Sequence, residues 1–234
     1  MPDEANLERL DPDAFRDTMD ALGPDDAMRI FGRGLRRRLA PMLGDDGPRL
    51  RLAFSLLFAM PGAPLICYGD EIGMAEDLSQ KGRNAVRSPM QWTKGRNGGF
   101  STAPKAQLAQ ALMTGDFGPN AVNAEDQWAD DGSLLNLVAR LAAIRLAHPG
   151  IGRRECRPIG DAPDSVIALR YAAADHDLVV IHNLSAKPAP LDLDLGASCR
   201  GGGAVLLGDP LSTDDGHLKV TLPAYDFRWS KWPR

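Results

Sequence analysis

Apolar residues recur at helical spacing in the first half of the chain and alternate with polar residues through much of the second half. In residues 132–147 the leucines lie three and four positions apart, which predicts an amphipathic helix ended by Pro149 and Gly150. Residues 48–60 are apolar on most sides of a helix and begin with Pro48, which fits a first helical position. The pattern therefore predicts one amphipathic helix and one largely buried helix.

Three further segments of the first half are less regular. Residues 27–43 have apolar positions at roughly helical spacing and predict a helix, weakened by two glycines. The run Arg36-Arg37-Arg38 is interpreted as the solvated face of that helix, with an anion site as the alternative. Residues 1–26 are expected to form a loop with short helical turns, and residues 105–113 a short helix.

The run Ala63–Tyr68 is apolar, follows a Pro-Gly turn and is too short for a core helix, so it predicts a buried strand. A helix, a turn and then a strand indicate β/α alternation and a parallel sheet. A long, Gly-rich loop, residues 69–104, follows this strand, and such loops are usually functional. Because sites in α/β folds lie at the carboxyl ends of strands, this loop is the first place to look for chemistry.

The pattern of apolar and polar residues changes near residue 150. Short alternating or β-rich runs follow, separated by turn-rich segments, which is the pattern of an antiparallel sandwich. The predicted strands are 154–159, 166–172, 178–183, 190–195, 204–207, 217–222 and 226–229. We therefore predict two domains, residues 1–152 and residues 153–234.

Composition excludes several classes of protein and partner. The chain has 44% hydrophobic and 25% charged residues and a net charge of −4, which fits a globular protein and favours neither nucleic acid nor an anionic membrane as partner. No apolar run has the length of a membrane span, and the N-terminus lacks a signal-peptide pattern. The three cysteines are widely spaced, which predicts reduced thiols in a cytoplasm. No Cys or His pair has zinc spacing, so we expect no metal and no cofactor.

Donors and one aromatic ring gather in the loop, a set that suits a ligand with many hydroxyls. Arg87 has a planar fork that can bind two hydroxyls, with a buried ion pair to a nearby carboxylate as the alternative. Gln91 and Trp92 are candidates for sugar contacts, with a packed hairpin anchor as the alternative. The substrate-binding prediction is therefore Arg87, Gln91 and Trp92.

Asp70 and Glu71 end the predicted strand and are the nearest carboxylates to this set. Adjacent residues on an extended chain point to opposite sides, so these two carboxylates do not make a catalytic pair. We predict that they are structural and hold the loop.

Three stretches carry a resemblance: YGDEIG from Tyr68, RSPMQW from Arg87, and NGGFST from Asn97. They resemble glycoside hydrolase family 13, the α-amylase superfamily, and its branch of trehalose synthases and α-glucosidases, and the likeness runs from about Asp3 to the C-terminus. The resemblance implies an α/β and then all-β chain. Residues 1–152 would be the C-terminal part of a (β/α)8 TIM barrel, with 63–68 as strand 8 between flanking helices. Residues 153–234 would be an antiparallel β-sandwich, domain C.

The resemblance also implies an activity, the cleavage or rearrangement of α-glucosidic bonds in maltose-like sugars. The family's nucleophile and general acid/base, about 5–5.5 Å apart, stand on strands that would precede residue 1. Asp3 matches the tail of the family's Asn-His-Asp-Glu stretch and would be the transition-state stabiliser. Met1 and Pro2 stand where that stretch has Asn and His, which weakens the assignment.

We therefore expect the C-terminal segment of such an enzyme, inactive alone, with α-glucoside sugars as ligands. One alternative is a split enzyme whose barrel an upstream chain completes. Another is a non-catalytic carbohydrate-binding or interaction module built on domain C. The family's calcium is not expected here, because no dense carboxylate loop is present.

Overall fold

The computed structural model describes residues 5–153 and 156–234. The described chain forms two compact units. The first unit contains the chain up to Leu50 and residues Leu65–Val138, and the second contains Arg51–Pro64 and Ala139–Arg234. The predicted boundary at 152/153 stays a prediction, but compactness divides the chain differently, because a segment from the first half belongs to the second unit. No helix among the described residues is long and apolar enough to cross a membrane.

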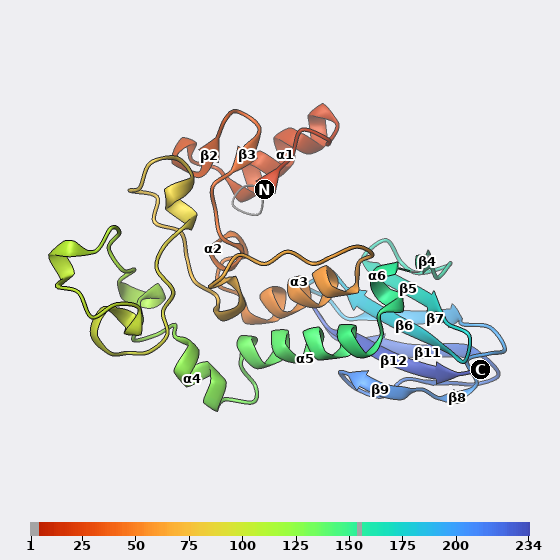
Figure 1. Ribbon diagram of the computed structural model, residues 1–234. Helices are drawn as coiled ribbons and strands as arrows, with labels where there is room; N and C mark the ends of the chain where they lie inside the picture. The colour runs from red at the N-terminus through yellow and green to blue at the C-terminus, as the bar shows by residue number, and fades with distance from the viewer. Residues whose placement is uncertain (1–4, 154–155) are drawn as a thin grey trace. The chain divides into compact units, whose positions relative to one another are not determined.

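The first unit begins with a small antiparallel sheet in the order β1-β3-β2 (Figure 1). Its strands are β1 (Ala5–Asn6), β2 (Arg29–Ile30) and β3 (Gly34–Leu35). Helix α1 (Pro12–Leu22) follows β1, and its N-cap Asp11 accepts hydrogen bonds from Asp13 N at 3.1 Å and Ala14 N at 3.0 Å. The sequence analysis expected only loop and short helical turns here, so α1 is a correction. The low apolar content gave no helical pattern, but the N-cap Asp11 marks where the helix begins.

Most of the remaining first unit is short and irregular. Two more α-helices, α2 (Leu39–Met42) and α4 (Ala124–Ala129), lie in it. The 3-10 turns are η1 (Asp26–Met28), η2 (Asp70–Ile72), η3 (Gly82–Val86), η4 (Arg96–Gly99), η5 (Lys105–Gln107) and η6 (Gly115–Phe117). The helix predicted over 105–113 is therefore wrong beyond one turn. Ile72, Met74 and Met90 of the long loop form a small buried apolar cluster, against which Val122, Ala124 and Leu135 pack.

The helix predicted over 27–43 is also wrong. A hairpin of β2 and β3 interrupts it, because Phe31 and Gly32 adopt left-handed backbone with φ of 55° and 67°. Glycine adopts this conformation without strain, and it reverses the chain where a helix would continue. Within the predicted range, only α2 is α-helical.

The buried strand predicted over 63–68 is a third correction. The structure assigns this segment to no strand, and Leu65 and Tyr68 are 71% and 52% exposed. A strand needs a neighbour to take its backbone hydrogen bonds. Every strand pair among the described residues is antiparallel, so these residues form no parallel sheet either.

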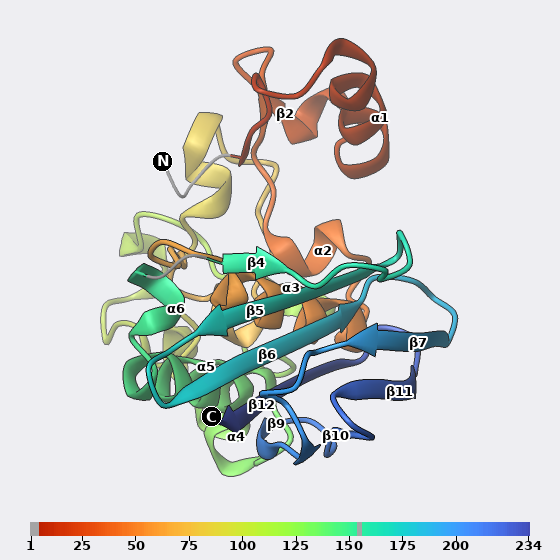
Figure 2. The same cartoon turned by 90° about the vertical axis from the view of Figure 1, so that its right-hand side faces the viewer.

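The second unit is built on an antiparallel five-stranded sheet in the order β4-β5-β6-β12-β9 (Figure 2). Two strand pairs, β11 with β7 and β10 with β8, complete it. The strands are β4 (Cys156–Pro158), β5 (Val166–Ala172), β6 (His176–Asn183), β7 (Ala189–Asp194), β8 (Gly201–Gly202), β9 (Ala204–Leu207), β10 (Ser212–Thr213), β11 (His217–Leu222) and β12 (Phe227–Pro233). Each of the seven predicted strands overlaps a strand of the structure, but residues 154–155 of the first lie outside the described residues, and β12 extends four residues beyond the predicted end at 229. The two-residue β8 and β10 were missed.

Alternation along β6 gives the five-stranded sheet two buried faces. Val179 and Ile181 point into an apolar core shared with Leu191 of β7 and Leu218 of β11. His182, one position on, lies on the other face. There Ser55 of α3 (Gly47–Ala59) hydrogen-bonds it.

Helices cover that second face. Tyr171 Oη of β5 donates to the carbonyl of Ala59 in α3, and Arg145 of α5 (Leu134–Ala147) donates to the carbonyl of Met60 at 3.0 Å. Helix α6 (Gly150–Arg153) follows α5. The predicted helices 48–60 and 132–147 are confirmed as α3 and α5, and their portions in the second unit form one layer of it.

Candidate functional site

The predicted site loop opens with a tight turn that only glycine fits. Gly69 and Gly73 flank η2 with φ of 95° and 77°. A Cβ on Gly69 would lie 2.5 Å from Met74 Sδ and 3.3 Å from Arg38 Nη1. The side chains of Met74 and Arg38 therefore pack directly against Gly69 and leave no room for a Cβ. This packing fixes the backbone that carries Asp70 and Glu71.

The two carboxylates of this turn serve different partners. Asp70 Oδ1 accepts from Arg38 Nη1 at 2.7 Å, and burial raises the pKa of Asp70 although the Arg38 charge opposes that rise. Glu71 Oε2 accepts from Gly69 N at 2.6 Å. Each carboxylate therefore holds the turn through its own hydrogen bond, and the purely structural role that sequence reasoning preferred to a catalytic pair stays a prediction.

The arginine run is not the solvated helix face that the sequence suggested. It lies in extended chain after β3, and Arg38 is only 3% exposed. Arg36 donates from Nη1 to Gln80 O at 2.5 Å and from Nη2 to Leu78 O at 3.2 Å. The run therefore binds the backbone of the site loop, and the helical reading failed because the hairpin before it ends the helical pattern.

Glu76 anchors the other two arginines. Its Oε1 accepts from Arg37 Nε at 2.8 Å, and its Oε2 accepts from the Arg38 backbone N at 2.8 Å. Arg38 then reaches Val86 O from Nη2 at 2.9 Å and Tyr68 O at 3.3 Å. We call Arg36, Arg37, Arg38, Asp70 and Glu76 the arginine clamp.

Sequence reasoning did not find the clamp. Its arginines and its carboxylates are far apart in sequence: the Arg38–Asp70 hydrogen bond joins positions 32 residues apart, and the Arg37–Glu76 hydrogen bond joins positions 39 residues apart. The only signal was a charge imbalance: three consecutive cations in one segment and carboxylates among apolar residues in the other. Buried charges occur almost only in pairs, so that imbalance is a usable cue.

The three predicted sugar-binding residues occupy different environments in the first unit. Arg87 is exposed and follows η3, and its backbone N donates to Asn84 O at 3.1 Å. Trp92 is 50% exposed and its N donates to Gly98 O at 2.7 Å. Both side chains are therefore accessible to solvent, and the sugar contacts remain predictions.

Gln91 is fully buried, and its Nε2 donates to Phe117 O at 3.1 Å and Val122 O at 2.7 Å. Its amide therefore ties the strand-like PMQW segment to the loop at 117–122. This is the anchoring alternative, while a direct sugar contact at Gln91 stays a prediction.

Gln91→Glu is expected to destabilise the first unit by about 3 kcal/mol, because a buried carboxylate would face two carbonyl oxygens. Trp92→Phe, at the next, exposed position, is the matched control and should leave the free energy of unfolding unchanged. Urea denaturation followed by circular dichroism measures both. Equal stability of the two variants would contradict the anchoring role.

Asp3, the predicted transition-state stabiliser, lies outside the described residues. Within the described ranges, no group of three His, Cys, Asp or Glu side chains is placed to hold a metal ion.

Comparisons with known proteins now bear on this geometry. The family described as "Alpha amylase, catalytic domain" matches residues 25–153, more than half of the chain and all three quoted motifs. The chain belongs to the α-amylase family. A second family, "Sucrose hydrolase-like, C-terminal domain", matches residues 176–231. The resemblance read from the motifs is thereby confirmed.

Relatives of this α-amylase-family chain include trehalose synthases. It is 37% identical over 233 residues to "Trehalose synthase/amylase TreS" of Mycobacterium tuberculosis, covering 97% of this chain and 39% of the relative. It is 36% identical over 197 residues to "Trehalose synthase" of Thermus thermophilus, covering 83% and 20%. The chain therefore spans at most about two fifths of the length of these curated relatives.

Solved α-amylase-family structures share the fold over most of the chain. The α-amylase from H. orenii is 27% identical with a TM-score of 0.64, covering 84% of this chain and 38% of that one. The trehalose-6-phosphate hydrolase of Bacillus licheniformis is 20% identical with a TM-score of 0.67, covering 85% and 42%. The neighbours are TIM-barrel enzymes matched in part, and this family member has a sheet-rich C-terminal part.

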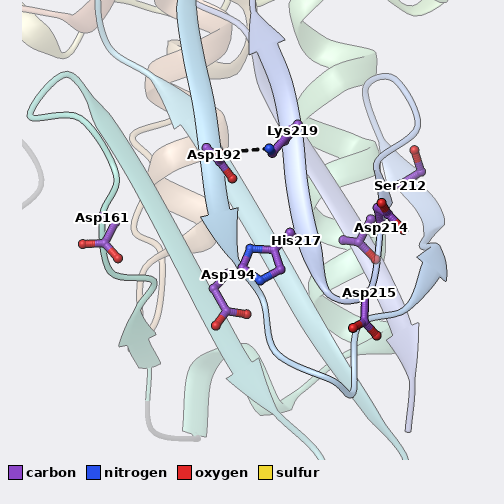
Figure 3. Close-up of a pocket in the computed structure, with 9 residues that line it drawn as sticks. Asp161, Asp192, Asp194, Ser212, Asp214, Asp215, His217 and Lys219 are labelled. Atoms are coloured by element: carbon purple, nitrogen blue, oxygen red, sulfur yellow. Dashed lines mark ion pairs between the residues drawn. The ribbon is translucent and has the colours of Figure 1, made fainter.

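The second unit has an open cavity of about 820 Å³ (Figure 3). Ser212, Thr213, His217, Lys219 and five aspartates line it: Asp161, Asp192, Asp194, Asp214 and Asp215. Lys219 Nζ lies 3.4 Å from Asp192 Oδ2, so part of the acidic charge is neutralised. No Phe, Tyr or Trp is among the residues that line this cavity, which makes it a poor platform for a sugar ring.

Proposed function

We propose that the chain supplies the C-terminal part of the (β/α)8 barrel and the β-sandwich domain C of an enzyme acting on α-glucosidic bonds of maltose-like sugars. The trehalose synthase and α-glucosidase branch fits best. The observation that carries this is the trehalose synthase match, which takes in 97% of the chain but 39% of the relative. Because the match takes in only 39% of the relative, the activity belongs to a catalytic unit larger than this chain.

The geometry of the 63–68 segment supports strand 8 of a barrel. Its side chains are apolar, Leu65 is 71% exposed, and it leads directly into the tight turn at Gly69. Such a segment is stable as a strand only between neighbours that bind its backbone. A pre-set turn at the carboxyl end of a barrel strand is where active-site loops belong.

In the proposed reaction, Arg87 and Trp92 contact the sugar and Asp3 stabilises the transition state. The nucleophile and general acid/base come from the part of the catalytic unit that this chain does not match, so the 234-residue chain alone should be inactive. Neither a metal nor a cofactor takes part. The absence of a disulfide among the three cysteines agrees with a cytoplasmic location.

A chimeric enzyme tests the proposal. The matching stretch of a trehalose synthase is replaced with this chain, and release of trehalose and glucose from maltose is measured. We expect conversion by the chimera, none by the chain alone, and a loss of at least about a hundredfold in kcat/KM for the chimera carrying Asp3→Asn. A folded chimera without activity, or maltose conversion by the chain alone that Asp3→Asn abolishes, would refute the proposal.

Two alternatives remain distinguishable. The exposed 63–68 segment favours a split enzyme if an upstream chain co-purifies with this one and restores maltose conversion. The non-catalytic sugar-binding module predicts heat on titrating the full chain with millimolar maltose. The full chain is the right sample, because α3 and α5 cover one face of the sheet in the second unit.

A further inference from the structure

A single buried side chain in the first unit binds two points of the site loop. Arg38 Nη1 donates to Asp70 Oδ1 at 2.7 Å near the start of the loop, and Arg38 Nη2 donates to Val86 O at 2.9 Å near its middle. The Arg38 side chain is only 2% exposed. A buried charge with several hydrogen bonds has little freedom to move, so these two points are held at a fixed separation.

The second of these points is the peptide group that precedes Arg87. The oxygen of that peptide is Val86 O, which accepts from Arg38, and its nitrogen is Arg87 N, which donates to Asn84 O at 3.1 Å. Both polar atoms of one peptide plane are therefore bound, and the plane fixes where the Arg87 side chain leaves the backbone. Arg38 itself is set by Glu76, which accepts its backbone N–H at 2.8 Å.

We propose that Arg38 is a positioning residue for Arg87: by holding the Val86–Arg87 peptide it sets the point from which the Arg87 guanidinium meets the sugar hydroxyls. This inference rests on the proposed function for its ligand, but its structural half stands on the clamp alone. Lysine cannot replace Arg38, because Asp70 and Val86 are bound by two different nitrogens of one planar fork.

The first test uses the full chain and no substrate. Hydrogen exchange of the Arg87 amide and its neighbours is compared between the wild type, Arg38→Lys and Arg16→Lys. Arg16 is the matched control, since its ion pair with Asp13 on α1 is 71% and 81% exposed. We expect about tenfold faster exchange at Arg87 in Arg38→Lys and no change in Arg16→Lys or in the second unit. Unchanged exchange at Arg87 would overturn the proposal.

A milder variant covers the case in which Arg38→Lys does not fold. Asp70→Asn keeps an oxygen for Arg38 but removes the charge that aims it. We expect faster exchange at Arg87 in this variant too, by a smaller factor of about three. Wild-type exchange in a folded Asp70→Asn chain would argue against the clamp.

The second test separates positioning from general stability through a double-mutant cycle in the maltose-active chimera. Arg38→Lys should raise KM for maltose about tenfold, and it should add nothing to KM in a chimera that already carries Arg87→Ala. Additive effects would show that Arg38 acts without Arg87 and would overturn the proposal. A chimera without maltose conversion would refute the proposed function, while the exchange experiment would still decide the positioning role.

Discussion

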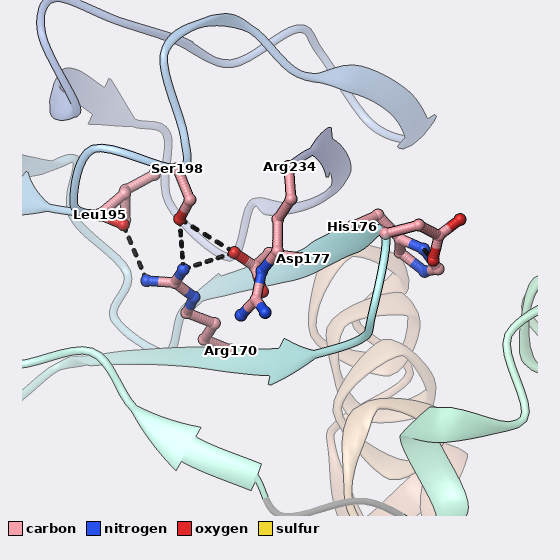
Figure 4. A network of polar contacts seen from close by, with 7 residues as sticks. Arg170, His176, Asp177, Leu195, Ser198 and Arg234 are labelled. Atoms are coloured by element: carbon pink, nitrogen blue, oxygen red, sulfur yellow. Dashed lines mark hydrogen bonds and ion pairs between the residues drawn. The ribbon is translucent and has the colours of Figure 1, made fainter.

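Asp177→Ala is expected to lower the free energy of unfolding of the second unit by about 3 kcal/mol. The Asp177 side chain is fully buried and accepts from Arg170 Nη2, from Arg234 Nη2 at 2.9 Å and from Ser198 Oγ at 3.1 Å (Figure 4). Alanine would leave two guanidinium groups without their shared carboxylate. Because both arginines are partly exposed, water would solvate their unpaired charges in part. The expected loss of stability is therefore at the low end of the range for a broken buried ion pair.

The neighbouring carboxylate provides the control. Asp175 is 80% exposed and pairs with His176 at 2.7 Å, so Asp175→Ala should leave stability unchanged within measurement. Urea denaturation followed by the fluorescence of the buried Trp229 and Trp232 reports on the second unit. Equal losses in the two variants would mean that the network of Asp177 contributes nothing beyond surface charge.

Asp177 also makes an acid-sensitive contribution. Burial alone would raise the pKa of Asp177, but the hydrogen bonds from Arg170 and Arg234 outweigh it, and the pKa is lowered. A carboxylate with a lowered folded-state pKa stabilises the protein above its unfolded pKa of about 3.9, and that stability is lost as the pH falls through the folded pKa. The stability that Asp177 contributes is therefore lost at pH values below about 4.

The second large effect is a loss of stability between pH 6.5 and 4 that originates in His182. Burial lowers the pKa of His182 to about 4. Its Nε2 lies 2.9 Å from Ser55 Oγ, which also accepts from Trp229 Nε1 at 2.8 Å. The neutral ring fits this apolar site between α3 and the sheet, and a charged ring would place a cation there without a counter-ion to offset its desolvation.

The direction and size of this loss of stability follow from the difference in proton binding between the folded and the unfolded chain. The unfolded chain takes up a proton at His182 near pH 6.5, whereas the folded chain does so only near pH 4. Stability from this group is therefore complete above pH 6.5 and decreases as the pH falls toward 4, by about 3 kcal/mol in all.

His182→Gln tests this, because glutamine can hydrogen-bond Ser55 but does not titrate. We expect this variant to be less stable than the wild type at pH 7.5. Its free energy of unfolding should depend much less on pH between pH 6.5 and 4. His217→Gln, at an exposed histidine lining the cavity of Figure 3, should keep the wild-type slope. A His182→Gln variant with the wild-type slope would assign the pH dependence to other groups.

Local patterns predicted what local chemistry controls. The alternation in Val166–Ala172 specifies a strand whose partners, β4 and β6, are its neighbours in sequence. The leucine spacing in Leu134–Ala147 specifies a helix, whose backbone hydrogen bonds are internal, and both elements formed as expected. The 27–43 prediction failed because two residues at a turn, Phe31 and Gly32, outweigh a helical pattern that the apolar positions suggest. The 63–68 prediction failed because a strand depends on neighbours that its own sequence does not contain.

The candidate site shows the same division. The motif around Arg87 and Trp92 could be read from the sequence, because its residues are contiguous. The clamp could not, because Arg38 acquires its role only when Asp70 and Val86, 32 and 48 residues away, come within hydrogen-bond distance of it. Spacing rules describe one element at a time, and buried ion pairs between loops lie beyond them.

The layer of helix on the second unit has a consequence for how the protein is made. Ser55 precedes its partners His182 and Trp229 by 127 and 174 residues. On the ribosome, α3 must therefore emerge long before β6 and β12 exist, with the surface that will cover the sheet still bare. Contacts this far apart in sequence slow folding and prolong the exposure of apolar surface. Translation through β12, rather than completion of the first unit, is therefore the step after which the second unit can bury this surface of α3.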